Sequence, residues 1–456
     1  MKIIIVGAGT IGFSLADLLS QNNHYVSLIE NDKGLCNEVN SKLDVFTVNG
    51  NGSSLKSLEQ AGIRDVDMII AVTPRDETNI LVCLFASHYN VKRRIARIIS
   101  DEYTLPEAVV SLADTGVTDV IETEKEVVGS ILQYLELPGV TLTANFQSDN
   151  VYLRGYVVGD HMPIANRTLA EVTRIAGPAP LLIVVIVREG RSIIPSGDEL
   201  LLPGDELIAI MHKDAFVTFR EMIGHGAEKL KKVIISGDTL TAVHLADALK
   251  PWVERIVLVD PDETHGQQAA AQLDGIEVIH GDCTKAEILQ ELHIQNASFF
   301  IAAGKDTEDN VMSCLLAKAE GTREVIAVNN SDRHAALFKS LGLDHIINPR
   351  KITVQKIIGS VLRIPIRAHL GLQRGDVEIV RTVAEANSRV VGKALKDLNK
   401  VLKKNVVLGA IMRQDHAIIP RGDTIIQEND EVIVICRQEK SKTVTRLFKS
   451  GPSIPV

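Results

Sequence analysis

The sequence predicts an α/β protein with two Rossmann-like, doubly wound parallel sheets, each followed by a small α+β domain. Three observations support this fold class. Short apolar segments alternate with helical ones, a glycine-rich turn follows the first apolar segment, and the whole pattern recurs in the second half. Short unbroken apolar runs suit strands buried on both faces, and their alternation with helices indicates a parallel order. At 456 residues the chain can hold several domains, each with its own core.

The N-terminal segment begins with a strand over 3–6, and a turn rich in glycine follows it. Gly7, Gly9 and Gly12 form the spacing G-x-G-x-x-G between that strand and a helix. In such a turn the first glycine allows a tight bend, the second lets the backbone approach a pyrophosphate, and the third lets helix and strand pack closely. Backbone N–H groups at a helix N-terminus also attract phosphate. The segment therefore predicts a nucleotide site.

Glu30 ends the second predicted strand, at 25–30, and lies 30 − 12 = 18 residues after the last glycine of the turn. A carboxylate at this place accepts hydrogen bonds from ribose hydroxyls. Asn31 and Asp32 follow, and no arginine stands beside Glu30. A 2′-phosphate would meet negative charge there, so the sequence favours NAD(H) over NADP. ATP and ADP stay open, because they present the same kinds of phosphate and ribose groups.

Three more strands complete the first nucleotide-binding domain, which we expect over 1–139. They are expected at 45–48, 68–72 and 95–99. Ligands of doubly wound sheets bind beyond the carboxyl ends of the strands. Thr73 and Arg97 come at those ends, together with Gly7 and Glu30. These four residues are therefore expected at one edge of the sheet.

Residues 140–225 differ in character, because strand-like segments are separated by turn-rich pieces. The segments are 151–158, 181–187 and 206–211. Turn sequences such as Pro203-Gly204-Asp205 between them are typical of antiparallel sheets. We therefore expect a small α+β domain here.

The second half repeats the first, domain for domain. Several separated landmarks share nearly one offset. Gly237, Asp260 and Asp282 match Gly7, Glu30 and Asn51, since 237 − 7 = 230, 260 − 30 = 230 and 282 − 51 = 231. A second Rossmann-like domain is expected over 231–370 and a second small domain over 371–453. The chain is interpreted as a tandem duplication of a two-domain unit.

The two copies differ in the glycine turn. Thr239 replaces Gly9, and Ala242 replaces Gly12. Side chains then stand where a pyrophosphate would touch the backbone. We expect an altered second nucleotide site, in which Gly237, Asp260 and Asp282 remain as candidate contacts on the ribose or adenine side.

Composition excludes several other classes of protein. The net charge of −9 argues against nucleic-acid binding, because no basic face is indicated. The longest apolar runs, such as 181–187, have the length of a strand and not of a membrane span. No export signal is recognised at the N-terminus. The five cysteines are odd in number and widely spaced, which predicts reduced, mostly buried thiols and neither a disulfide framework nor a metal site.

The organisation resembles the tandem regulator-of-potassium-conductance (RCK) family, in particular the regulatory subunits of Trk-type potassium uptake systems. The resemblance covers nearly the whole chain. The residues that carry it are Gly7-Ala8-Gly9-Thr10-Ile11-Gly12, Gly50-Asn51-Gly52-Ser53, Ala71-Val72-Thr73-Pro74-Arg75-Asp76-Glu77-Thr78-Asn79 and Ile95-Ala96-Arg97. It implies that Gly7 to Ile11 hold the pyrophosphate and that Glu30 holds the ribose. It further implies that Thr73-Pro74 border the nicotinamide side and that Arg97 adds charge near the phosphates.

The resemblance also implies a non-enzymatic, cytoplasmic subunit that lies on the inner face of the membrane through a potassium transporter partner. Nucleotide-dependent changes in a ring of such chains would control potassium flux. Duplication within one chain predicts a homo-oligomer of few chains, a dimer or tetramer. Two other classes stay open. A soluble NAD-dependent dehydrogenase would need a proton-transfer residue from a substrate domain, and a structural scaffold would carry only vestigial nucleotide sites.

Overall fold

The computed structural model divides into two compact units, and each unit combines segments from both halves of the chain. The parallel-sheet unit comprises Met1–Leu132 and Lys229–Ser360, and the antiparallel-sheet unit comprises Gln133–Glu228 and Val361–Val456. The residues described are 1–105, 111–137, 139–146, 150–224, 230–330, 335–343, 345–361, 377–402, 406–414 and 416–450. Like domains of the two halves are thus joined, although they are far apart in the sequence.

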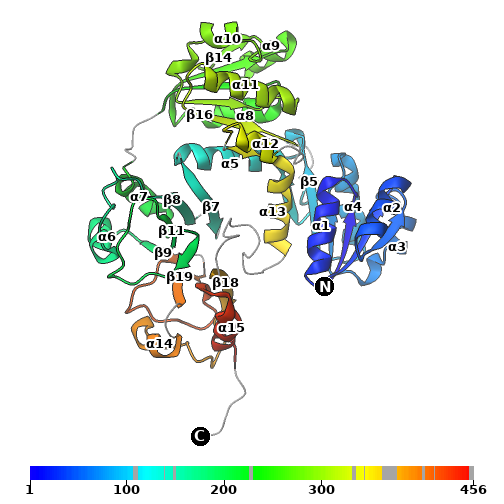
Figure 1. The fold of residues 1–456 in the computed structure, drawn as a ribbon. Coiled ribbons are helices and arrows are strands. Elements are labelled where there is room, and N and C mark those ends of the chain that lie inside the picture. Colours follow the sequence, from blue (N-terminus) through cyan, green and yellow to red (C-terminus); the bar gives the residue numbers. More distant parts are fainter. Residues whose placement is uncertain are drawn as a thin grey trace. The chain divides into compact units, whose positions relative to one another are not determined.

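The first parallel sheet, which lies in the blue to cyan part of the ribbon (Figure 1), has the strand order β3-β2-β1-β4-β5-β6. Its strands are β1 (Lys2–Val6), β2 (Tyr25–Glu30), β3 (Phe46–Asn49), β4 (Met68–Ala71), β5 (Arg93–Ile98) and β6 (Asp119–Glu122). Its helices are α1 (Thr10–Gln21), α2 (Lys33–Lys42), α3 (Leu55–Gln60), α4 (Asp76–His88) and α5 (Thr123–Glu136). This order confirms the predicted doubly wound sheet, whose winding reverses between β1 and β4. A crevice for a ligand is expected at that switch point.

The second parallel sheet repeats this topology, in the order β14-β13-β12-β15-β16-β17. Its strands are β12 (Leu230–Ser236), β13 (Val253–Asp260), β14 (Glu277–His280), β15 (Phe299–Ala302), β16 (Glu324–Val328) and β17 (Ile346–Ile347). Its helices are α8 (Leu240–Ala248), α9 (Glu263–Gln272), α10 (Ala286–Glu291), α11 (Thr307–Ala319), α12 (Ala335–Ser340) and α13 (Pro349–Val361). The repeat seen in the sequence is therefore a repeat of the fold.

Local sequence explains these elements. The apolar run Ile3–Val6 is buried throughout, as the central strand of a sheet covered on both faces must be. Helix α2 begins at Lys33 because the Asp32 side chain caps it, accepting a hydrogen bond of 2.9 Å from the Leu35 N–H. Asp306 caps α11 in the same way, with a bond of 3.0 Å from the Asp309 N–H.

The two parallel sheets are linked through α5 and α13. The Thr123 and Thr353 hydroxyl oxygens lie 3.3 Å apart, and Lys356 forms an ion pair of 2.9 Å with Glu126. In both pairs the partners are duplicates of one another, because 353 − 123 = 230 and 356 − 126 = 230. Equivalent residues that meet each other define a local twofold relation between the halves.

The antiparallel-sheet unit holds two smaller sheets, in the orders β10-β9-β11-β8-β7 and β18-β21-β19-β20. The strands of the first are β7 (Val140–Phe146), β8 (Val151–Val157), β9 (Leu181–Arg188), β10 (Arg191–Ile193) and β11 (Glu206–His212), with helices α6 (Leu169–Ala176) and α7 (Phe216–Met222). Those of the second are β18 (Val377–Val383), β19 (Val406–Arg413), β20 (His416–Ile418) and β21 (Glu431–Arg437), with helices α14 (Leu395–Leu402) and α15 (Ser441–Phe448). The two sheets share one apolar core, in which Val184 and Ile210 pack with Ile433 and Ile435.

The small antiparallel domains confirm the expected α+β class. The described helices include none that combines the length and the apolar character needed to cross a bilayer. All five cysteines are free and buried. Burial raises the pKa of the Cys83 thiol to about 12, so this side chain behaves as a core residue rather than as a reactive thiolate.

Candidate functional site

A cleft of about 560 Å³ opens at the carboxyl ends of the central strands of the first parallel sheet. The loops that follow β1, β2, β3 and β4 line it, so it lies at the switch point of the sheet. The lining residues include six of the predicted site residues. These are Gly7, Gly9, Glu30, Asn51, Thr73 and Pro74.

The glycine turn has the geometry that the G-x-G-x-x-G spacing predicts. Gly7 has φ = +103°, a conformation that side chains disfavour, and its N–H donates to the Ile29 carbonyl oxygen at 2.9 Å. A Cβ at Gly12 would lie 1.8 Å from the Gly7 carbonyl oxygen, so only glycine lets α1 pack this closely on the turn. Ile11, next to Gly12, is buried in the core.

Gly9 differs from these two positions, because a Cβ there would meet no atom within 4 Å. Its backbone is extended, with φ = −60° and ψ = −177°, so the fold itself does not require glycine at this place. Gly9 precedes the first residue of α1 and has no side chain that caps the helix. Open space beside uncapped helix N–H groups is what an approaching pyrophosphate needs.

Glu30 connects the turn to the end of β2. One carboxylate oxygen accepts a hydrogen bond of 2.6 Å from the Ala8 N–H, and the other accepts one of 2.9 Å from the Asp32 N–H. The side chain is buried, with 9% of its surface exposed. Each carboxylate oxygen retains acceptor capacity beyond these bonds. Glu30 can therefore hold the loop and accept from a ribose hydroxyl at the same time.

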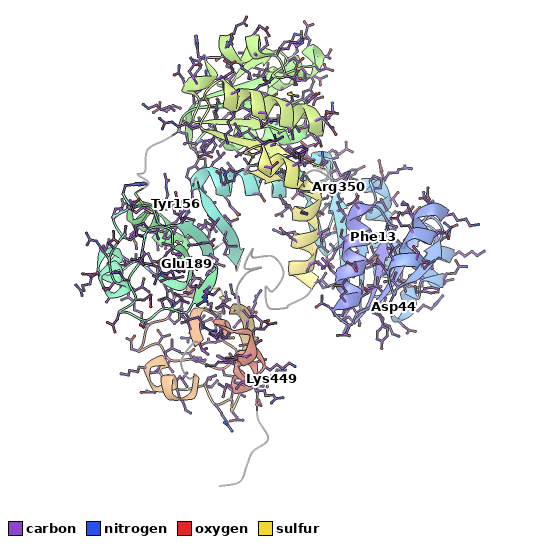
Figure 2. The ribbon with its side chains drawn as sticks, in the orientation of Figure 1. Phe13, Asp44, Tyr156, Glu189, Arg350 and Lys449 are labelled. Atoms are coloured by element: carbon purple, nitrogen blue, oxygen red, sulfur yellow. The ribbon has the colours of Figure 1, made fainter. Side chains whose placement is uncertain are left out.

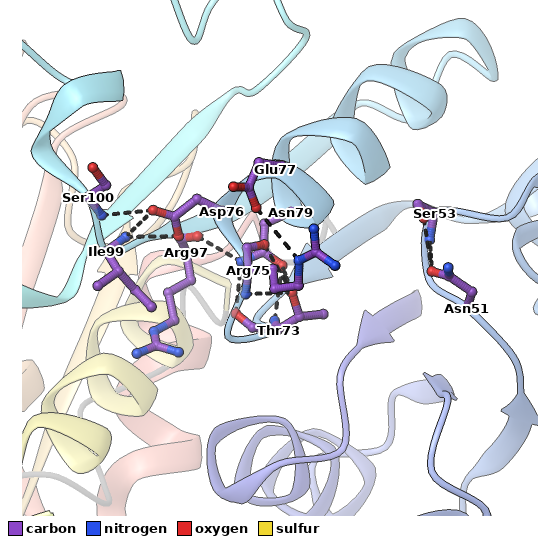
Figure 3. Close-up of polar contacts among 10 residues, drawn as sticks. All are labelled: Asn51, Ser53, Thr73, Arg75, Asp76, Glu77, Asn79, Arg97, Ile99 and Ser100. Carbon is purple, nitrogen blue, oxygen red and sulfur yellow. Dashed lines mark hydrogen bonds and ion pairs between the residues drawn. The ribbon is translucent and has the colours of Figure 1, made fainter.

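The loop after β3 is ordered by its own side chains. The Asn51 amide oxygen accepts from the Ser53 N–H at 3.0 Å and from the Ser53 hydroxyl at 2.9 Å (Figure 3). A Cβ at Gly52 would lie 2.1 Å from Val6 Cγ1, so this loop lies directly against the end of β1. Asn51 thus shapes one wall of the cleft.

A buried asparagine holds the opposite wall. The Asn79 amide oxygen accepts from the Thr73 N–H at 3.0 Å, and its amide nitrogen donates to the carbonyl oxygens of Thr73 at 3.0 Å and Arg97 at 2.9 Å (Figure 3). Asn79 is fully buried. Asp76 adds a second link between α4 and the end of β5, accepting from the Ser100 N–H at 2.7 Å. Both residues position the loops. The sequence signal for this role is the repeated Glu-x-Asn segment, which Asn79 ends and Asp76 directly precedes.

Arg97 lies outside the cleft lining. Its guanidinium is directed away from Thr73 (Figure 3). Its Nε donates to the Thr123 hydroxyl at 3.1 Å. Burial lowers the pKa of Arg97, an effect that the nearby Asp76 and Glu124 carboxylates oppose. Arg97 is thus at the expected end of β5, but on the side of the sheet where α5 begins.

The corresponding loops of the second half are closed by their own side chains. The Lys305 ammonium forms an ion pair of 2.7 Å with Asp238, and these two residues occupy the places of Pro74 and Ala8. Burial opposes ionisation of Asp238, but the bonds from Lys305 outweigh it and lower the pKa of that carboxyl. The ion pair therefore bridges the two loops that flank the cleft in the first half.

The other candidate residues of the second half are also engaged internally. Thr239, in place of Gly9, donates its hydroxyl to the Ala303 carbonyl oxygen at 2.6 Å. Asp260 is fully buried and bonds the Asp262 N–H and the His265 ring. Asp282 accepts from Thr284 at 2.6 Å in the same kind of turn that Asn51 makes. Gly237 keeps a positive φ of 155°.

Comparison with known proteins decides the family. The TrkA-N domain model matches residues 3–123 and 233–349, and the TrkA-C domain model matches 153–224 and 379–449. The chain belongs to the TrkA family. A Trk system potassium uptake protein TrkA from Azorhizobium caulinodans is 32% identical over 454 residues, covering 98% of this chain and 99% of the relative. A TrkA homolog from Archaeoglobus fulgidus is 30% identical, covering 98% of this chain and the whole relative.

Solved structures show the same fold as this TrkA-family chain. The GsuK RCK domain superposes with a TM-score of 0.59 at 19% identity, over 98% of this chain and 94% of that one. The GsuK channel bound to NAD gives a TM-score of 0.60 at 20% identity, over 98% of this chain and 78% of that one. The paired matches of both TrkA domain models confirm the tandem duplication and the resemblance to the RCK family.

Proposed function

We propose that this TrkA-family chain is the nucleotide-binding regulatory subunit of a Trk-type potassium uptake system, and that the first-half cleft is its sensor. The observation that carries the proposal is the pairing of the open Gly9 backbone with Glu30 across one cleft. The first offers unhindered backbone to a pyrophosphate, and the second offers carboxylate oxygens to a ribose. Family membership supplies the link to potassium uptake.

NAD(H) is the nucleotide that the cleft favours, with ATP and ADP as the alternatives. Asp32 and Glu30 place two carboxylates at the ribose end of the cleft. A 2′-phosphate would be repelled there, whereas a free ribose diol is not. Gly7 to Ile11 would hold the pyrophosphate, and Thr73 with Pro74 would border the far end of the ligand. Because the Lys305–Asp238 ion pair bridges the corresponding loops of the second half, we expect one bound nucleotide per chain.

The proposed role is regulatory and not catalytic. The described residues that line the cleft include no histidine, lysine, cysteine or tyrosine. The three carboxylates among these residues are already engaged, because Glu30 accepts from two backbone N–H groups, Asp32 caps α2 and Glu77 pairs with Arg75. A dehydrogenase needs a proton-transfer group beside the reacting carbon. A regulator needs only a ligand that binds one conformation of the assembly more tightly than another.

The proposed setting is the cytoplasmic face of the membrane, with a Trk-type potassium transporter as partner and other copies of this chain around it. A homo-oligomer of two or four chains suits the internal twofold relation that Thr123 and Thr353 mark. With a net charge of −9 the chain is not expected to bind nucleic acid.

The proposal is tested by affinity capture of the tagged full chain from gently solubilised native membranes, followed by mass spectrometry. Enrichment of a polytopic potassium transporter is the expected result. The matched control is the same capture with a Gly9→Leu chain, which keeps the fold and should retain the partner but lose any dependence on added nucleotide. Recovery of the chain without a membrane protein, together with NADH turnover on hydroxy or keto acids, would favour the dehydrogenase instead.

A further inference from the structure

One side chain of the second half reaches the glycine turn of the first. Arg350 stands at the N-terminal end of α13 (Figure 2), and its Nη1 donates to the Thr10 hydroxyl oxygen at 3.1 Å. Thr10 is the first residue of α1 and follows Gly9 directly. The guanidinium is therefore placed at the helix N-terminus where the phosphates of a bound nucleotide are expected.

Arg350 belongs to a helical turn that the first half lacks. Ile121 of β6 pairs with Arg97 of β5, and Ile347 of β17 pairs with Val328 of β16. The strands β6 and β17 therefore match at an offset of 347 − 121 = 226. The helices that follow match at 353 − 123 = 230. Four extra residues thus lie between strand and helix in the second half, and they form the first turn of α13. Arg350 has no counterpart in the duplicate.

A second arginine lies close to this one. The positive charge of Arg350 contributes to lowering the pKa of Arg97, after the larger effect of burial. Arg97 uses its Nε for Thr123, and among the described residues neither Arg97 nor Arg350 forms an ion pair with a carboxylate. Two neighbouring guanidinium groups repel each other, and an anion bound between them would relieve the part of that repulsion that the Asp76 and Glu124 carboxylates do not offset.

The two arginines of this corner have no counterparts at the duplicate corner of the second half. Leu240 takes the place of Thr10, since 240 − 10 = 230, and 39% of its side chain is exposed. Val328 takes the place of Arg97, since 328 − 97 = 231, and it is buried. The two cations therefore lie beside the glycine turn that is open to a ligand, whereas at the duplicate corner the Thr241 hydroxyl donates to the Glu124 carboxylate.

We propose that Arg350 is a phosphate-binding residue that the second half contributes to the nucleotide site of the first half. The inference rests on the proposed function, because it names a contact of the same site. Guanidinium groups bind phosphate oxygens through paired N–H donors, and such charge-assisted bonds are among the stronger ones in proteins. A nucleotide held by both halves would bind more tightly when the two parallel sheets keep this arrangement. Binding would thereby be coupled to the relation between the halves.

The test uses calorimetric titration of the purified full chain with NADH, ADP and adenosine. Arg350→Ala is expected to weaken NADH and ADP binding by about tenfold, the size of one charge-assisted hydrogen bond, while adenosine binding stays unchanged. Arg350→Lys should recover part of the loss, because the charge remains but the paired donors do not. The matched control is Arg323→Ala, which removes an exposed arginine that precedes β16, at the opposite end of the second sheet.

Each outcome has one meaning. If the wild-type chain binds NADH and ADP and Arg350→Ala binds them equally well, the inference is refuted and the proposed function stands. If the variant loses adenosine and ADP affinity in equal proportion, Arg350 acts through the fold and not through phosphate, which also refutes the inference. If the wild-type chain binds none of the three probes and does not bind ATP, the proposed function itself fails. Hydrogen exchange adds a second readout, because ADP should protect 346–353 in the wild type and not in Arg350→Ala.

Discussion

Replacing Glu30 by glutamine tests the role of its carboxylate in the first-half cleft. Both oxygens accept from backbone N–H groups, at 2.6 Å from Ala8 and 2.9 Å from Asp32. In Glu30→Gln one acceptor becomes an NH₂ group, which faces a backbone N–H that it cannot bond. A buried donor left without a partner costs about 1–3 kcal/mol, and the remaining bond weakens because the negative charge is gone. We expect a local loss of about 2 kcal/mol.

Amide hydrogen exchange is the suitable assay, because unfolding of a chain with two compact units need not be two-state. A loss of about 2 kcal/mol corresponds to exchange about thirtyfold faster at the amides of Ala8 and Asp32. NADH affinity should fall by about tenfold or more, since the variant also loses its charged acceptor for the ribose.

The matched control is Asp260→Asn, the same change at the duplicate position. It should accelerate exchange at Asp262, whose N–H Asp260 accepts at 2.8 Å, and leave NADH affinity unchanged. Unaltered exchange at Ala8 and Asp32 in Glu30→Gln would refute the structural reasoning. Unaltered NADH affinity would refute the assignment of Glu30 to the ribose.

Three further predictions concern the turn, the cleft wall and a small domain. Gly9→Leu should leave the melting temperature within about 2 °C of the wild-type value, because a Cβ there meets no atom within 4 Å. The same variant should lose NADH binding measured by fluorescence. A folded variant that binds NADH normally would contradict this prediction. Asn79→Leu should lower the free energy of unfolding in denaturant by about 2–4 kcal/mol and weaken NADH binding. Its control is Asn310→Leu, which loses the equivalent bonds to Gly304 and Val328. This control should destabilise the chain without changing its affinity for NADH. Burial opposes ionisation of Asp205, but the bonds from Arg188 and the Leu202 N–H lower the pKa of its carboxyl. The stability that this carboxylate contributes is therefore complete above about pH 4, and it is lost as the pH falls through the depressed pKa. Arg188→Ala should cost about 2–3 kcal/mol in thermal melts and move this acid transition to higher pH, and a melting profile that does not change with the variant would contradict the pairing.

The fold could be predicted from sequence because its signals are local. Buried strands such as Ile3–Val6 read as unbroken apolar runs, and the glycine turn has a spacing that few other structures require. Because the pattern repeats at offsets near 230, these signals occur in both halves of the chain. The strand β7 was not predicted, although Val140–Phe146 alternates apolar with polar residues, which is the pattern of a half-buried strand rather than of the unbroken apolar runs.

The candidate site was predicted less completely, because parts of it depend on contacts between distant segments. Gly7, Gly9 and Glu30 lie together as their spacing indicates. Asn79 was recognised only as part of a repeated segment, and its bonds to Thr73 and Arg97 follow from the packing of α4 against the ends of two strands. The Arg350 contact depends on the packing of like domains from the two halves into one unit. That packing has no local signal in the sequence.

Nucleotide in the first-half cleft is proposed to control potassium uptake. The most direct measurement is radioactive rubidium uptake by vesicles that contain the captured transporter together with either the wild-type chain or Gly9→Leu, with and without NADH or ATP. We expect nucleotide to change the uptake rate with the wild-type chain and not with Gly9→Leu. A nucleotide response of equal size with both chains would contradict it.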